Sequence, residues 1–168
     1  AAMAFELPSD LHPDVAPLAW MLGTWRGNGH GDYPTIDKHE FGQELIFTHD
    51  GRPFLQYLSR TWVIDDAGEH VREDMVETGF VRGTSDGKGT ARVEMVVAHH
   101  TGVVEIYYGE ASGGRMDLST DAVARTESAH EVVSATRLYG NVEGDLLYAY
   151  DVAAEGQALQ PRAWARLQ

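Results

Sequence analysis

The hydrophobic residues after Gly23 fall into short runs rather than long helical stretches. These runs are rich in Val, Ile, Tyr, Phe, Thr and Trp, and turn residues interrupt them at roughly ten-residue spacing. The turn segments are Asp50–Gly51, Asp66–Gly68, Ser85–Gly89, Thr101–Gly102, Ser112–Gly114 and Glu143–Asp145. Short strands at such regular intervals are typical of an all-β sandwich or an up-and-down barrel.

In two of the runs, the side chains on alternate positions help to distinguish a barrel from a sandwich. From Phe54 to Trp62, one face carries Leu55, Tyr57, Ser59 and Thr61, and the other carries Phe54, Gln56, Leu58, Arg60 and Trp62. From Val103 to Gly109, the side chains of Val104, Ile106 and Tyr108 lie opposite Glu105 and Tyr107. Neither face is cleanly polar, which fits a barrel with a partly polar interior. We therefore predict a single antiparallel up-and-down β-barrel of about ten strands between Gly23 and Leu167.

One segment has the features of a helix. Pro13 and Asp14 suit a first helical turn, Leu18, Met21 and Leu22 share a face, and Gly23 suits the end of the segment. Without a second helix of ordinary length, α/β folds are disfavoured. We expect one domain over residues 1–168, with residues 1–10 as a flexible N-terminal arm.

Composition and charge narrow the choice of partners. The net charge is −13, from 26 acidic and 13 basic residues, so a phosphate backbone or an anionic membrane is an unfavourable partner. The chain has no cysteine, which excludes thiolate catalysis and zinc–thiolate sites. Because neither a signal peptide nor a transmembrane run is recognisable, we expect a cytoplasmic location.

The segment 23–31 carries glycine at every second position. It is not a P-loop, because no Lys-Ser/Thr pair follows, and it is not a dinucleotide fingerprint, because it lacks the strand–turn–helix context. Glycines at this period leave one face of a strand without side chains. The two interpretations are a sharply coiled barrel strand and a close approach of ligand to backbone.

No cluster of catalytic or metal-binding type stands out. None of the eight histidines forms a helical metal motif, and no G-x-S-x-G elbow is present. His99 and His100 are adjacent, so on a strand one of them would point into the barrel. Near the C-terminus, Pro161 predicts an edge or a bulge in the closing strand. If Arg162 beside it points inward, this buried cation needs a carboxylate or an anionic ligand.

An ordered set of segments resembles the nitrobindin family. Residues 23–36 resemble its GxWxGxG…YPTI motif, and four further segments match in order along nearly the whole chain. These are residues 49–55 (H-x-G-x-P-F-L), 77–80 (E-S-G-Y), 98–105 (A-(H/Q)-x-(S/T)-G-x-x-E) and 159–161, before the last strand. The resemblance implies a barrel similar to fatty-acid-binding proteins that carries ferric haem b on one histidine, in a run like L-Q-P-H-L. It also implies nitric oxide binding and isomerisation of peroxynitrite to nitrate.

Arg162 stands where that pattern places the haem-ligating histidine, and arginine has no free lone pair for iron. We therefore expect a barrel without cofactor or metal, binding a small, largely apolar and anionic ligand, rather than an enzyme. The residues expected at the ligand are Gly23, Trp25, Gly27, Gly29, Thr35, Met75, His99 and Arg162.

Two alternatives remain open. In the first, the chain binds haem b through His99 as a substitute ligand and handles nitric oxide or peroxynitrite. In the second, the barrel serves protein–protein contact or storage, with a homodimer surface built from aromatic residues. The aromatic candidates for that surface are Trp20, Trp62, Tyr107, Tyr108 and Trp164.

Overall fold

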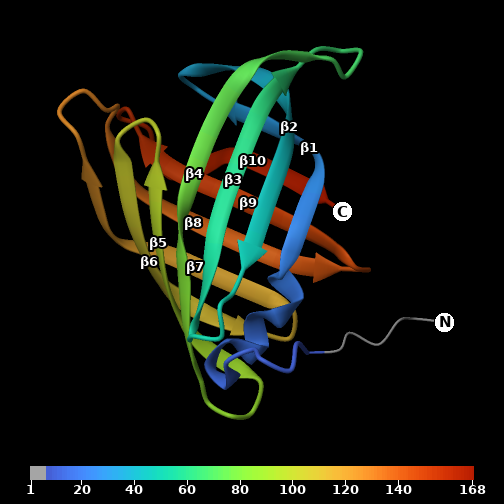
Figure 1. The fold of residues 1–168 in the computed structure, drawn as a ribbon. Helices are drawn as coiled ribbons and strands as arrows, with labels where there is room; N and C mark the ends of the chain where they lie inside the picture. The colour runs from blue at the N-terminus through green and yellow to red at the C-terminus, as the bar shows by residue number, and fades with distance from the viewer. Residues whose placement is uncertain (1–6) are drawn as a thin grey trace.

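The computed structural model describes residues 7–168, and in this part of the chain ten antiparallel strands form one closed barrel (Figure 1). Each strand pairs with its neighbours in sequence, and β1 closes the barrel by pairing with β10. The strands are β1 (Gly23–Tyr33), β2 (Ile36–Thr48), β3 (Phe54–Ile64), β4 (His70–Ser85), β5 (Thr90–His99), β6 (Val103–Ser112), β7 (Arg115–Arg125), β8 (Val132–Val142), β9 (Asp145–Ala154) and β10 (Gln160–Leu167). The predicted fold class and strand number are confirmed.

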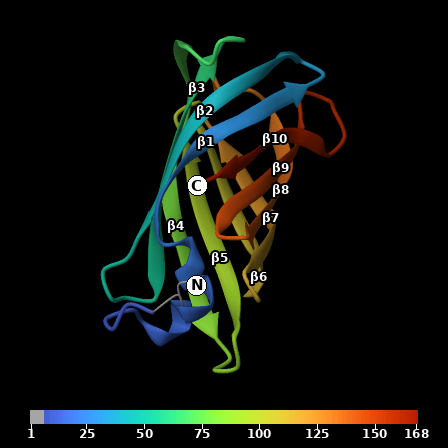
Figure 2. The same cartoon turned by 90° about the vertical axis from the view of Figure 1, so that its right-hand side faces the viewer.

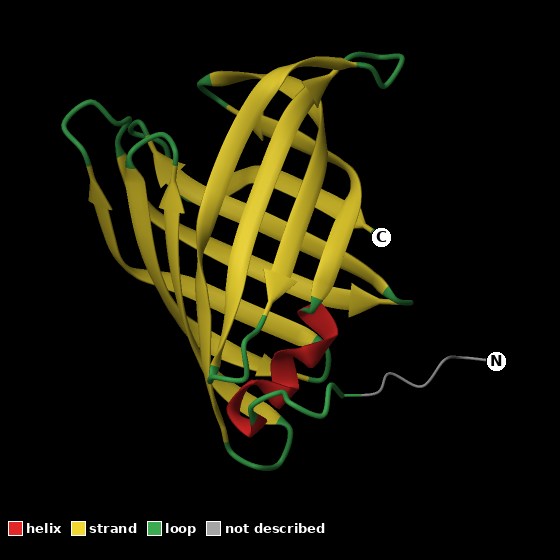
Figure 3. Cartoon of the chain, viewed as in Figure 1, coloured by secondary structure: helices red, strands yellow, loops and turns green. Residues whose placement is uncertain are grey.

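A short helix, η1 (Pro13–Met21), precedes the strands and covers one end of the barrel (Figure 3). It is a 3-10 helix, and Pro17 inside it lacks the N–H that a continuous α-helical ladder would use. The carboxylate of Asp14 accepts a hydrogen bond from the Ser85 N–H at 3.1 Å. A Cβ at Gly83 would lie 2.7 Å from the Asp14 carbonyl oxygen, so glycine allows the helix to lie directly on β4.

The opposite end of the barrel is its mouth. Strands alternate in direction, so every second connection lies at the end away from η1. In Figure 2 the helix η1 is at the lower end of the barrel, and the mouth is at the upper end. The connections at the mouth are residues 34–35, 65–69, 100–102, 126–131 and 155–159. The β7–β8 ladder covers only Arg115–Ser119 against Thr136–Gly140. Beyond it, the Ala135 N–H donates to the Thr120 hydroxyl, and the wall separates toward the mouth.

Alternation along the strands decides which side chains enter the barrel. In β3 the predicted face of Leu55, Tyr57, Ser59 and Thr61 is the buried one. In β6 the buried face holds Val103, Glu105 and Tyr107, and Glu105 is completely inaccessible to solvent. A carboxylate therefore lies inside the barrel.

The predicted irregularity at Pro161 is present. The β9–β10 register shifts between Pro161 and Ala163, and β1 pairs with β10 only from Ala163 onward. Of the predicted arm, residues 1–6 lie outside the described part of the chain. Within residues 7–168, no helix has the length and apolar character needed to cross a membrane.

Candidate functional site: a cavity with a buried charge network

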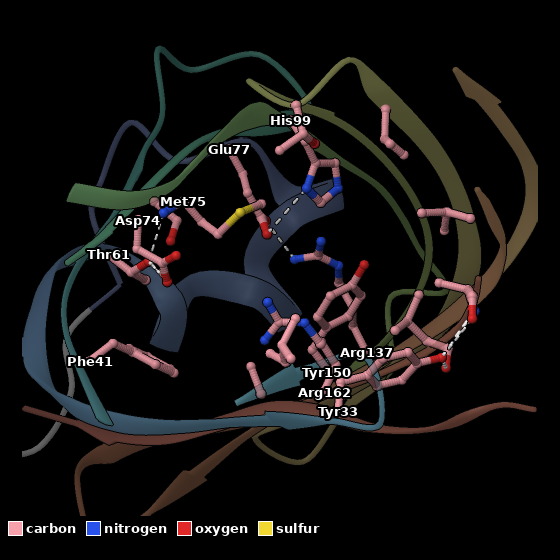
Figure 4. Close-up of a pocket in the computed structure, with 18 of the residues that line it drawn as sticks. Tyr33, Phe41, Thr61, Asp74, Met75, Glu77, His99, Arg137, Tyr150 and Arg162 are labelled. Atoms are coloured by element: carbon pink, nitrogen blue, oxygen red, sulfur yellow. Dashed lines mark hydrogen bonds and ion pairs between the residues drawn. The ribbon is translucent and has the colours of Figure 1, made fainter. Parts of the chain in front are cut away.

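A cavity of about 380 Å³ occupies the mouth half of the barrel. Ligand sites in proteins typically enclose about 300–1,000 Å³, so the space suits a small molecule. Figure 4 shows side chains from opposite walls converging on it. The aromatic and apolar lining includes Tyr33, Phe41, Leu45, Tyr139, Tyr148 and Tyr150, and the mouth segments contribute Thr35, Thr101, His130, Glu131 and Glu155.

Four ionisable side chains from four strands meet along one side of the cavity. Arg137 of β8 donates to Glu77 of β4 at 2.8 Å and to Glu105 of β6 at 3.0 Å. His99 of β5 hydrogen-bonds Glu105 through Nε2, and its Nδ1 lies 3.6 Å from Glu77. All four side chains are at least 88% inaccessible. Their charges therefore act on one another with little solvent screening.

The network fixes the charge of each member. Burial alone would raise the pKa of Glu105, but Arg137 and the hydrogen bond from His99 hold that pKa at about 2. Burial also opposes ionisation of Glu77, yet Arg137 and His99 outweigh it and lower the pKa. For His99 burial favours the neutral ring, but the Glu77 charge and the bond to Glu105 raise the pKa. The network thus favours the charged form of each of the three side chains, beside the Arg137 guanidinium.

Tyrosine hydroxyls complete the network. Tyr57 donates to Glu77 at 2.9 Å, Tyr150 donates to Glu105 at 3.1 Å, and the Arg137 Nε–H donates to the Tyr107 hydroxyl at 2.9 Å. The Arg137 guanidinium also lies 4.6 Å from the centre of the Tyr150 ring. With a further bond from Nη1 to the Tyr139 hydroxyl at 3.3 Å, Arg137 makes four hydrogen bonds with its five N–H donors, so it holds the cavity wall together.

Arg162 lies in the cavity wall in a different situation. It is the extra residue at the β10 bulge, and a bulge allows two consecutive side chains, here Arg162 and Ala163, to face the same cavity. Figure 4 shows its side chain reaching into the space near Tyr33 and Tyr150. Among residues 7–168 no side chain forms an ion pair or hydrogen bond with the Arg162 guanidinium. The cavity therefore contains one cation that is available to an anionic group.

Three histidines line the cavity, and they differ in how far their ring nitrogens are engaged. Both nitrogens of His99 face carboxylates, so neither offers a lone pair while these contacts hold. His130 has a side chain that is 82% exposed, and its Nδ1 pairs with Glu155 at 3.0 Å. In His39 of β2, the Nδ1 hydrogen-bonds the Asp37 carbonyl oxygen at 3.0 Å. The Nε2 of this ring is buried and has no hydrogen-bond partner among the described residues.

The residues expected at the ligand divide into two groups. Thr35, Met75, His99 and Arg162 line the cavity. The other four, Gly23, Trp25, Gly27 and Gly29, are not among its lining residues. The Trp25 indole N–H instead donates to the Met21 carbonyl at 2.8 Å, beside the helix.

The glycines of β1 support the cavity wall without facing the cavity. A Cβ at Gly29 would lie 2.4 Å from the Phe41 ring, and a Cβ at Gly31 would lie 2.4 Å from the His39 ring. The missing side chains thus make room for two rings of β2 that themselves line the cavity. Of the two interpretations of the glycine run, the close approach is real, but it is made by protein side chains.

Of the buried network, only His99 was among the residues predicted for the site, whereas Glu77, Glu105 and Arg137 were not. Its members are separated by up to 60 positions, so no local motif joins them. A signal is nevertheless present at two of them. Glu105 lies between Val103 and Tyr107 on one strand face, and Arg137 lies between Ala135 and Tyr139. A single charge flanked at positions i±2 by apolar or aromatic residues indicates a buried, paired charge.

Comparison with known proteins places the barrel in a family. The family model described as the THAP4-like, heme-binding beta-barrel domain matches residues 14–168. A protein of Nocardioides sp. named peroxynitrite isomerase is 61% identical over 98% of both chains. A protein of Streptomyces griseus named ferric nitrobindin-like protein is 47% identical, over 97% of this chain and 85% of the relative.

The fold comparison agrees. The crystal structure of Rv2717c from M. tuberculosis superposes with a TM-score of 0.78 and 32% identity, covering 94% of this chain and 98% of that one. The chain belongs to the THAP4-like, nitrobindin-type family of haem-binding β-barrels.

Proposed function

We propose that this barrel binds haem b in its cavity and, in that form, isomerises peroxynitrite. The observation that carries the proposal is the cavity inside the barrel, in a chain whose family is haem-binding and whose 61% identical relative is named peroxynitrite isomerase. This favours the haem alternative of the sequence analysis over the expectation of a barrel without cofactor.

Different residues of the cavity wall suit the macrocycle of a haem and the carboxylates on its edge. Tyr33, Phe41 and Leu45 offer flat and apolar surface for a macrocycle. Arg162 lies near the mouth and has a guanidinium free to pair with a carboxylate, the charge that haem carries on its edge. Arg162 would thus anchor a haem carboxylate, although it cannot bind the iron.

Among the lining residues of the described chain, two imidazole nitrogens have no hydrogen-bond partner: Nε2 of His39, which is buried against Gly31, and Nε2 of His130, which is exposed. One protein ligand is sufficient to hold a haem iron. Bound haem would supply the iron at which nitric oxide or peroxynitrite binds. The chain's own contribution would be a shielded, largely apolar space and a cation at its mouth.

A haemin titration followed by visible absorption tests the proposal. It should use the wild type and Arg162→His, in which an imidazole would enter the same cavity. We expect a saturable Soret band from the wild type, and peroxynitrite decay accelerated by the loaded protein but not by the apoprotein. A Soret band from Arg162→His alone would show that the pocket accepts haem but that this chain does not hold it.

A second candidate is binding of a small apolar molecule with an anionic head group, without haem. The observation in its favour is Arg162, whose guanidinium lies in the cavity with no ion pair among the described residues. Native mass spectrometry against a panel of fatty and aromatic carboxylates tests it. Arg162→Ala should lose binding at least tenfold, whereas Arg92→Ala, at an exposed arginine of β5, should not.

A further inference from the structure

A bulge in β4 places two consecutive side chains at the cavity. The β3–β4 register shifts between Arg60 and Trp62, which leaves Asp74 and Met75 together opposite Thr61. The Met75 N–H donates to the Thr61 hydroxyl at 3.0 Å, and that hydroxyl donates to the Asp74 carboxylate at 3.2 Å. A bulge re-aims side chains in this way, and here both Asp74 and Met75 line the cavity.

Met75 differs from the other methionines in its accessibility. Of the four methionines in residues 7–168, Met21, Met95 and Met116 are completely inaccessible to solvent, whereas Met75 is only partly buried. It lies in the half of β4 next to the mouth connection 65–69. Figure 4 shows its sulfur directed toward the cavity, beside Glu77. A small molecule that enters through the mouth therefore reaches one thioether among the described residues.

An accessible thioether reacts with peroxides by transfer of one oxygen atom. The sulfur lone pair attacks a peroxide oxygen, so that an S–O bond forms and the O–O bond breaks. The sulfur is oxidised to the sulfoxide by loss of an electron pair. Hydrogen peroxide is reduced to water, since the proton on the transferred oxygen moves to the leaving hydroxide, and peroxynitrite is reduced to nitrite.

We propose that Met75 is an oxidation site inside the cavity: its thioether takes an oxygen atom from a small peroxide, and the sulfoxide weakens the binding of apolar ligands. The modification replaces a flexible apolar side chain with a polar one. The nearby carboxylates of Asp74 and Glu77 accept hydrogen bonds and repel the negative end of the S–O dipole. The sulfoxide oxygen therefore turns into the ligand space, where an apolar ligand must desolvate it.

The test exposes the full-length apoprotein to hydrogen peroxide and maps the oxidised methionines by mass spectrometry of its peptides. Met75 should gain one oxygen atom about tenfold faster, or more, than the three buried methionines. Oxidation should weaken the binding of anilinonaphthalene sulfonate several-fold, and methionine sulfoxide reductases should restore it. The probe, bound before the peroxide is added, should slow the oxidation of Met75.

Met75→Leu is the matched control, because leucine keeps an apolar side chain without a sulfur. This variant should bind the probe before treatment and lose none of that binding after the same exposure to peroxide. An equal loss in Met75→Leu and wild type, or buried methionines that oxidise as fast as Met75, would overturn the inference, as would an oxidised Met75 with unchanged probe binding. The thioether reacts without haem, so a wild type that fails to bind haemin would overturn the proposed function and leave this inference intact.

Discussion

Arg137 is the residue on which the buried network depends, because it donates to both of the carboxylates that enter the barrel. Arg137→Met should destabilise the protein by about 3–5 kcal/mol, since it leaves two buried anions with His99 as their only cationic neighbour among the described residues. Urea unfolding followed by tryptophan fluorescence measures this loss. Arg52→Ala, at an arginine paired with Asp50 on the surface, should have little effect. Equal losses would argue against the network as a source of stability.

The pKa values of the network give a second residue-scale prediction. The pKa of Glu105 is lowered from 4.5 to about 2, so the folded state binds its proton more weakly than the unfolded chain does. Its stabilisation is complete above pH 4.5 and is lost as the pH falls through the folded value. A shift of this size contributes up to about 3 kcal/mol.

Unfolding free energies measured from pH 7 down to pH 2 test this contribution. Glu105→Gln should flatten the acid limb of the curve. Glu110→Gln removes one charge from an exposed position of the same strand and serves as the control. An acid limb that is equally steep in wild type and Glu105→Gln would mean that other groups govern acid unfolding.

At the scale of the element, β1 is a strand whose missing side chains shape its neighbour. A Cβ at Gly29 would lie 2.4 Å from the Phe41 ring and 2.7 Å from Ala165 Cβ. Gly29→Ala should therefore cost about 1–3 kcal/mol and displace the Phe41 ring toward the cavity, with weaker ligand binding. In Gly140→Ala a Cβ meets nothing within 4 Å, so this strand glycine should tolerate the change. Thermal unfolding and haemin affinity of the two variants give the comparison.

The strands also show what the sequence could and could not predict. Turn residues and period-two alternation were sufficient for ten strands, and Pro161 predicted the bulge, because these features depend on local backbone chemistry. Barrel closure settles which face of a mixed strand points inward, so the complete burial of Glu105 was not predicted, although its neighbours Val103 and Tyr107 on the same face are a signal of it. His39 lies between Lys38 and Glu40 in the sequence, which gives no sign that its ring lines the cavity, where the missing side chain of Gly31 makes room for it.

At the scale of the whole molecule, the negative net charge repels an anionic ligand, whereas the cavity contains a cation that attracts it. The chain carries a net charge of −13, and Glu131 and Glu155 stand at the mouth, whereas Arg162 offers a local cation inside. The acidic surface acts over a Debye length of about 30 Å at 0.01 M salt but only about 8 Å at 0.15 M. Raising the salt should therefore speed the association of an anionic probe several-fold, because repulsion during approach is screened before the contact with Arg162 forms.

Stopped-flow fluorescence with anilinonaphthalene sulfonate can measure both rates. Arg162→Ala should mainly raise the dissociation rate, because the guanidinium acts after entry, and it should keep the same direction of salt dependence. Association that slows with added salt would mean that cations at the mouth, rather than the acidic surface, govern the approach. The same two rates show where the anionic ligand is recognised. If recognition occurs inside the barrel, Arg162→Ala should change the dissociation rate and leave the association rate unchanged. If recognition occurs at the mouth, the association rate should change as well.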